Sequence, residues 1–186
     1  GGEMAEPLAY ALDTGLAGVE GLCSAMPINA NDGVLRLAVW TGDDPRTLTA
    51  GRLVQVGDEL AFLPEEPVTS PTDIKACLLT DTGAVVYSAP ARAAVQLDRR
   101  GKSHTLLLDT SGGFSVTDAD GNRSSFAVSD GITVRAPRLP IDMVGTGDTR
   151  GGGYPGGIVV IGGEDENGED RVVFVDPSVL TLSAFE

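Results

Sequence analysis

The sequence predicts an all-β protein, an antiparallel β-sandwich or barrel built from short hairpins. Short runs of β-prone residues alternate with turn residues at intervals of roughly 8–12 residues, a spacing typical of sandwiches and barrels. Glycine accounts for 25 of the 186 residues, about twice its usual share, and 11 prolines add further turns. The predicted strands are 34–40, 48–56, 59–63, 74–79, 84–89, 91–97, 103–108, 114–117, 123–128, 132–136, 158–161, 171–175 and 179–185.

Residues 1–32 are expected to lie outside the β domain. Gly1-Gly2-Glu3 precedes Met4 and is interpreted as the remnant of an expression tag. Apolar residues then recur at intervals of three and four, which would place them on one face of a helix. Glycines interrupt this pattern, each costing ~1 kcal/mol relative to alanine in a helix interior. We therefore expect an arm or short, weak helix whose apolar positions are Leu8, Leu12, Leu16, Val19 and Cys23.

The rest of the chain is expected to form one domain with one long loop. Residues 33–136 form an antiparallel β domain, and 158–186 add a C-terminal β-hairpin and strand that complete it. Between them, residues 137–157 hold seven glycines and three prolines without periodicity. This composition predicts a Gly/Pro-rich loop, and a loop longer than an ordinary connection is usually functional or disordered. Arg150 and Tyr154 are its candidate partner-binding residues, because arginine and tyrosine are enriched at interface hot spots. A disordered linker is the alternative.

Two short loops fix strand pairing by symmetry. Gly57-Asp58 has the glycine-first signature of a two-residue hairpin loop. In a second hairpin, Asp81-Thr82-Gly83 predicts a three-residue loop. Both faces of that hairpin are apolar, so it is expected near the centre of the core. The expected pairs are Leu79 with Val85, Leu78 with Val86, and Cys77 with Tyr87.

A third hairpin turns at 118–122 and allows two registers. A two-residue loop would mix polar and apolar residues on each face. A three-residue loop, with Gly121 left-handed, sets Phe114 opposite Phe126 and leaves the other face polar. We predict the three-residue register. The acidic residues of this turn also resemble a calcium loop, but an EF-hand loop would end on a Glu where this chain has Ser129, so a turn is favoured.

The last hairpin carries an acidic tip at 164–170. Asn167-Gly168 predicts a two-residue loop, which sets Glu166 opposite Glu169 and Asp165 opposite Asp170. Like charges directly opposite each other are destabilising. The tip is therefore expected to fray into solvent or, as the alternative, to bind calcium through oxygen ligands. The candidate metal ligands are Asp165, Glu166, Glu169 and Asp170.

Asp81-Thr82-Gly83-Ala84, after a run of leucines, resembles the active-site loop of retroviral-type aspartic proteases. That family places a catalytic aspartate on such a turn and shares a proton across a pair of them. Residues 158–162 are similar to the family's later hydrophobic–hydrophobic–glycine element. Thr80 stands where the family has an apolar residue, and the Asp109 turn is too close in sequence to supply a second lobe. A hairpin turn is therefore the favoured interpretation.

Charge and composition exclude several classes of function. The chain has 27 acidic and 13 basic residues, a formal net charge of -14, whereas nucleic acids and anionic membranes are bound by basic surfaces. It contains no apolar run long enough to span a membrane. One histidine and two cysteines leave few groups for catalysis or a zinc site, and His104 is expected in a strand, partly exposed.

The cysteines and the first residues suggest a compartment. Cys23 and Cys77 are isolated in apolar surroundings, which favours reduced core thiols, with a disulfide as the alternative. A secretory signal needs a positively charged segment followed by an apolar stretch, and neither is seen from Met4 onward. We expect synthesis in a cytoplasm without a signal peptide and, for a structural protein, assembly into a virion.

Three functions follow from this composition. The favoured one is a non-enzymatic structural or attachment protein of a larger assembly, for which a phage or virus particle (capsid decoration, tail or fibre type) is the concrete setting. Its partners would be other protein subunits in a homo-oligomer, with no cofactor. The alternative is a carbohydrate- or calcium-binding β module that recognises surface carbohydrate. The remote alternative is a retropepsin-like aspartic protease.

Overall fold

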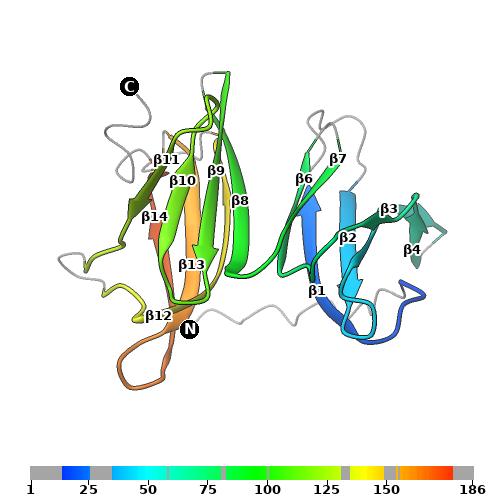
Figure 1. The fold of residues 1–186 in the computed structure, drawn as a ribbon, viewed down its shortest axis with the longest axis horizontal. Helices are drawn as coiled ribbons and strands as arrows, with labels where there is room; N and C mark the ends of the chain where they lie inside the picture. Colours follow the sequence, from blue (N-terminus) through cyan, green and yellow to red (C-terminus); the bar gives the residue numbers. More distant parts are fainter. Residues whose placement is uncertain are drawn as a thin grey trace.

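Paired strands make up most of the chain, and all their pairings are antiparallel. The computed structural model describes residues 14–25, 35–57, 59–80, 83–99, 101–130, 135–148, 154 and 156–177. These residues contain no helix, so the predicted all-β class is confirmed. No helix long and apolar enough to cross a membrane occurs among them. Figure 1 shows two lobes side by side, the N-terminal lobe from β1 to β7 and the C-terminal lobe from β8 to β14.

The N-terminal lobe consists of a curved sheet and a hairpin that covers it. The sheet has the order β1-β2-β3-β4, with β5 also paired to β3, and β6 pairs with β7. Its strands are β1 (Val19–Ala25), β2 (Leu35–Thr41), β3 (Thr47–Val56), β4 (Glu59–Pro64), β5 (Val68–Thr69), β6 (Ala76–Thr80) and β7 (Gly83–Tyr87). The buried side chains between them are Ala38, Trp40, Leu48, Ala50, Ile74, Cys77 and Leu79.

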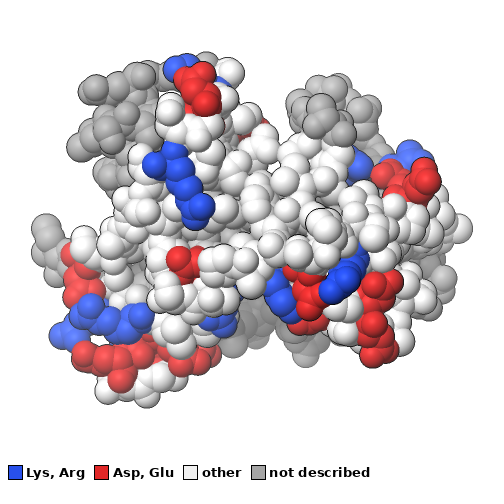
Figure 2. Space-filling view, viewed as in Figure 1, with Lys and Arg blue, Asp and Glu red and all other residues white. Residues whose placement is uncertain are grey.

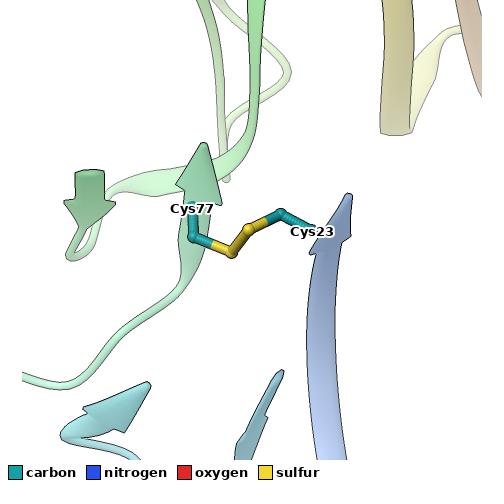
Figure 3. Close-up of a disulfide and its surroundings, with 2 residues drawn as sticks. All are labelled: Cys23 and Cys77. Atoms are coloured by element: carbon teal, nitrogen blue, oxygen red, sulfur yellow. A yellow bond between two sulfur atoms is a disulfide. The ribbon is translucent and has the colours of Figure 1, made fainter. Parts of the chain in front are cut away.

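A disulfide joins the two layers of this lobe. Cys23 in β1 and Cys77 in β6 have their Cα atoms 5.7 Å apart and their sulfur atoms bonded at 2.09 Å (Figure 3). The expectation of reduced thiols is therefore wrong. The two cysteines are 54 positions apart in sequence, and they meet only because β6 packs against β1.

The C-terminal lobe is a sandwich of two sheets, β11-β10-β9-β8 and β12-β13-β14. Its strands are β8 (Ala91–Arg99), β9 (Lys102–Asp109), β10 (Phe114–Thr117), β11 (Arg123–Phe126), β12 (Leu139–Thr146), β13 (Ile158–Glu164) and β14 (Asp170–Val175). Buried side chains from both sheets form one cluster: Ala93, Val95, Leu97, Leu106, Leu108, Phe114, Val116, Met143, Val159, Ile161 and Val173. The region 33–136, expected as one β domain, thus contributes to two hydrophobic clusters.

Two predicted registers are confirmed. Val56 pairs with Glu59, which leaves a two-residue loop that begins at Gly57. Phe114 pairs with Phe126, and their rings stack with centroids 5.3 Å apart. Gly121 has a φ of 86°, the left-handed conformation that the three-residue loop requires.

The predicted register of the β6–β7 hairpin is wrong by one residue. Leu79 pairs with Ala84, and Thr80 pairs with Gly83. Gly83 therefore belongs to the strand instead of the loop, and the Thr80 hydroxyl donates a hydrogen bond to its carbonyl at 3.0 Å. Asp81 and Thr82 lie outside the described residues.

The expected N-terminal helix is also wrong where the structure describes it. Residues 19–25 form strand β1, which pairs with β2 along its length. Gly21 faces Trp40, whose ring occupies the space a side chain at position 21 would need. Val19 and Cys23, two of the apolar positions that suggested a helix, therefore lie in a strand. Residues 4–13 and 26 lie outside the described part.

The predicted loop at 137–157 contains a strand instead. Residues 139–146 form β12, which pairs with β13. A Cβ atom at Gly147 would lie 2.1 Å from the backbone oxygen of Asp98, so glycine here permits close contact with β8. The glycines that suggested a free loop thus include close-packing positions. The predicted strand 132–136 is described only at Arg135 and Ala136, and neither residue is in a strand. The predicted strand 179–185 lies outside the described residues.

Candidate functional site

Three turns of the C-terminal lobe share one geometry, each beginning with an aspartate. They are 109–113, 118–122 and 165–169. In each, one carboxylate oxygen of the aspartate accepts hydrogen bonds from the backbone N–H groups two and four residues later, at 2.8–3.1 Å. The fourth residue is a glycine with positive φ. Asp118 and Asp165, which suggested calcium binding, are thus residues that build these turns.

Hydrogen bonding stabilises the ionised form of all three carboxylates. The pKa of Asp109 is lowered mainly by the Ser111 hydroxyl, and that of Asp118 mainly by the Asn122 side chain. The pKa of Asp165 is lowered mainly by the Arg171 guanidinium, which donates to it at 2.8 and 3.1 Å. Because the folded chain hydrogen-bonds to the charged form, these aspartates stay ionised to a lower pH than an aspartate with its ordinary pKa.

The predicted register of the acidic tip is wrong by one residue. Glu164 pairs with Asp170, and Asp165 closes the turn by a backbone hydrogen bond with Glu169. The turn built by Asp165 has three central residues, 166–168, between Asp165 and Glu169. It forms in place of the two-residue Asn167-Gly168 loop that the sequence predicted. Val160 consequently pairs with Phe174 and Ile161 with Val173.

Arginines engage three of the four candidate metal ligands: Arg171 lies 2.8 Å from Asp165 and 3.8 Å from Glu169. Asp165 binds Arg171, Glu166 forms an ion pair with Arg135 at 3.0 Å, and Asp170 lies across the ladder from Glu164. No group of three or more His, Cys, Asp or Glu side chains suited to a metal is found among the described residues. Figure 2 shows charges of both signs side by side at this end of the C-terminal lobe.

The remaining candidate residues are dispersed. Tyr154 lies half-buried beside the β12–β13 connection, and Arg150 lies outside the described residues. Residues 158–162 of the protease-like element form part of β13, between β12 and β14. His104 in β9 is only 2% exposed, so the expectation of a partly exposed histidine is wrong.

A shallow cleft of about 300 Å³ lies where the two lobes meet. Its lining includes Tyr87 from β7, Pro90 from the connection between the lobes, and Asp109 and Arg123 from the C-terminal lobe. Burial raises the pKa of Tyr87, and a hydrogen bond with Thr105 opposes that shift. An aromatic ring, a guanidinium and a carboxylate in one cleft offer contacts that suit a small polar ligand.

The outer face of the β12–β13–β14 sheet carries a group of exposed apolar side chains. The register places Val144, Val160 and Phe174 in one row across the three strands, pointing away from the core. Val144 is 60% exposed, Phe174 is 59% exposed, and Val172 in the next row is 60% exposed. Ile158 is half-buried on the same face. We call Val144, Ile158, Val160, Val172 and Phe174 the outer apolar patch.

The sequence contains a signal for this patch that the turn analysis did not use. Residues 171–175, RVVFV, are apolar at successive positions, and successive residues of a strand point to opposite faces. Val173 is 6% exposed on the inner face, whereas Val172 and Phe174 point outward. A strand that is apolar on both faces is typical of a sheet whose two faces are both covered.

Carboxylates border the outer apolar patch. Asp142 lies in the row of Val172, and Glu164 and Asp170 form the next row on the same face. No lysine or arginine occupies an outward position on these strands, all of whose residues are described. Arg171 in β14 lies at an inward position and forms its ion pair with Asp165.

Comparisons with known proteins add no identity. No protein-family model matches the chain, and no curated protein matches it.

Proposed function

We propose that this protein is a non-enzymatic structural or attachment component of a larger assembly, in which the outer apolar patch contacts another protein subunit. The observation that supports the proposal is the cross-strand row of Val144, Val160 and Phe174, extended by the exposed Val172. Contiguous exposed apolar surface on a folded domain marks interaction sites. A virus particle is the setting that suits an acidic, β-rich chain of this kind.

Site-specific photo-crosslinking tests this proposal. A photoreactive amino acid is introduced at position 172, and at position 56 as the control, because Val56 in the N-terminal lobe is equally exposed at 62%. The chain is produced in its native cells and irradiated. We expect a discrete protein adduct from position 172 and none from position 56. Equal adducts from both positions, or none from 172, would contradict the proposal.

A carbohydrate-binding module is the second candidate, and the cleft between the lobes favours it. Tyr87 and Arg123 line this cleft, and aromatic and charged side chains are common in ligand sites. A glycan array probed with the protein and with the Arg123→Ala variant tests this candidate. Binding that the substitution removes would support it.

A further inference from the structure

We propose that the occupant of the outer apolar patch is a different protein whose contact surface is apolar and flanked by lysine or arginine. This inference rests on the proposed function, since it specifies the partner of the same face. It excludes a second copy of this chain as the occupant of that face. A homo-oligomer would have to form through another surface.

The charges around the patch carry this inference. Asp142, Glu164 and Asp170 all point outward, and the last two lie directly across the ladder from each other. Like charges in that arrangement repel. Three arginines of the described residues lie near this end of the sheet, and each forms an ion pair with another carboxylate: Arg171 with Asp165, Arg135 with Glu166, and Arg138 with Asp130. A partner that supplies cations at this border would be attracted to it.

Symmetry argues against self-association through the same face. A two-fold dimer brings the same patch of both copies together, so the border carboxylates of both copies would enter one interface, where no outward lysine or arginine of these strands offsets them. The whole chain has a net charge of -14, which adds long-range repulsion between copies. The patch therefore meets an electrostatic penalty with itself and a favourable field with a basic partner.

The apolar centre determines the rest of the partner's chemistry. Phe174 stands on β14, which pairs only with β13 among the described strands, and its ring is exposed beside Val172 and Val160. Aromatic side chains, phenylalanine among them, are enriched at the cores of protein interfaces. A purely cationic ligand would leave this ring and the valines in water, so the partner must also present apolar side chains.

Designed peptides test both requirements with defined probes. The probes are three fluorescent peptides of equal length that alternate leucine with lysine, leucine with glutamate, and serine with lysine. Fluorescence anisotropy measures their binding to the full chain at several salt concentrations. We expect the leucine–lysine peptide to bind, the serine–lysine peptide to bind at least tenfold more weakly, and the leucine–glutamate peptide not to bind.

Two pairs of variants locate the binding. Val172→Asn/Phe174→Asn should weaken the leucine–lysine peptide at least tenfold, whereas Val56→Asn/Leu60→Asn, which alters two exposed apolar residues of the N-terminal lobe, should not. Glu164→Gln/Asp170→Asn should weaken binding several-fold and reduce its salt dependence. Its control, Asp43→Asn/Glu66→Gln, removes the same charge from exposed positions of the other lobe and should change binding little.

Each contrary outcome overturns the inference in a distinct way. Binding of the leucine–glutamate peptide, or equal losses in the test and control variants, would show that the face has no preference for a basic apolar partner. A dimer detected by light scattering and abolished by Phe174→Asn would identify a second copy as the occupant. If position 172 still crosslinks in cells in either case, the proposed function stands and only the partner's chemistry is wrong.

Discussion

The two lobes are stabilised in different ways. In the N-terminal lobe the buried cluster includes small side chains such as Ala38 and Ala50, and the Cys23–Cys77 disulfide joins its two layers. In the C-terminal lobe a larger described cluster contains Leu97, Leu106 and Leu108. Its turns are closed by aspartates in place of a covalent link. The difference indicates that a covalent bond supplements packing where the apolar interior is small.

The strongest test of this comparison removes packing from the C-terminal lobe. Leu108 is fully buried, so Leu108→Ala should lower the free energy of unfolding by about 2–5 kcal/mol through lost burial and a residual cavity. Its neighbour Leu107 points to the opposite face and is half-buried, so Leu107→Ala should cost less. Chemical denaturation, monitored through hydrogen exchange of the β9 amides, measures the loss of unfolding free energy in both variants. Equal costs would contradict the sandwich packing.

The second test removes the disulfide from the N-terminal lobe. Cys23→Ala/Cys77→Ala releases a cross-link between residues 54 positions apart, which should cost about 2–4 kcal/mol, mainly because the unfolded chain regains conformational freedom. Trp40 is the single tryptophan of the chain and is 7% exposed in this lobe. Its fluorescence therefore reports unfolding of this lobe. An unchanged midpoint would show that packing alone maintains the lobe.

A smaller effect is expected at the turns of the C-terminal lobe. Gly121 has positive φ, so Gly121→Ala should destabilise by about 1 kcal/mol because alanine is strained there. Gly162 in β13 supplies a matched control, since a Cβ atom at that position meets no atom within 4 Å and its φ is not positive. Thermal unfolding compares the two variants. A shift in Tm as large for Gly162→Ala would contradict the turn argument.

The mildest test uses pH to separate the lobes. The pKa values of Asp109, Asp118 and Asp165 are lowered in the folded chain, so their contribution to stability is present above the usual aspartate value of about 4. It is lost as the pH falls through the lowered values. Protection of the β9 and β13 amides, taken as their exchange rate relative to that of an unfolded chain at the same pH, should therefore fall below about pH 4, earlier than the Trp40 signal changes.

The matched variant replaces all three aspartates by asparagine, which retains an acceptor oxygen but does not titrate. The protection of its C-terminal-lobe amides, corrected for the intrinsic exchange rate at each pH, should depend less on pH in the same range. Equal pH dependence of the triple variant and the natural chain would show that other carboxylates control acid unfolding.

The amino-acid sequence alone determined the all-β class and the limits of most strands, because alternation and turn residues act locally. It also determined the Phe114–Phe126 register, since only one loop length separates polar from apolar faces. Tertiary structure decided the rest. Packing of β6 on β1 brings Cys23 to Cys77, and contact with β13 and β8 makes a strand of residues 139–146, inside the segment predicted to be a loop. Three hydrogen-bonding groups around Asp165 prevail over the Asn-Gly signal. The outer apolar patch could not be predicted from the sequence either. Exposure depends on which face of a strand the other sheet covers, and that is a property of the whole fold.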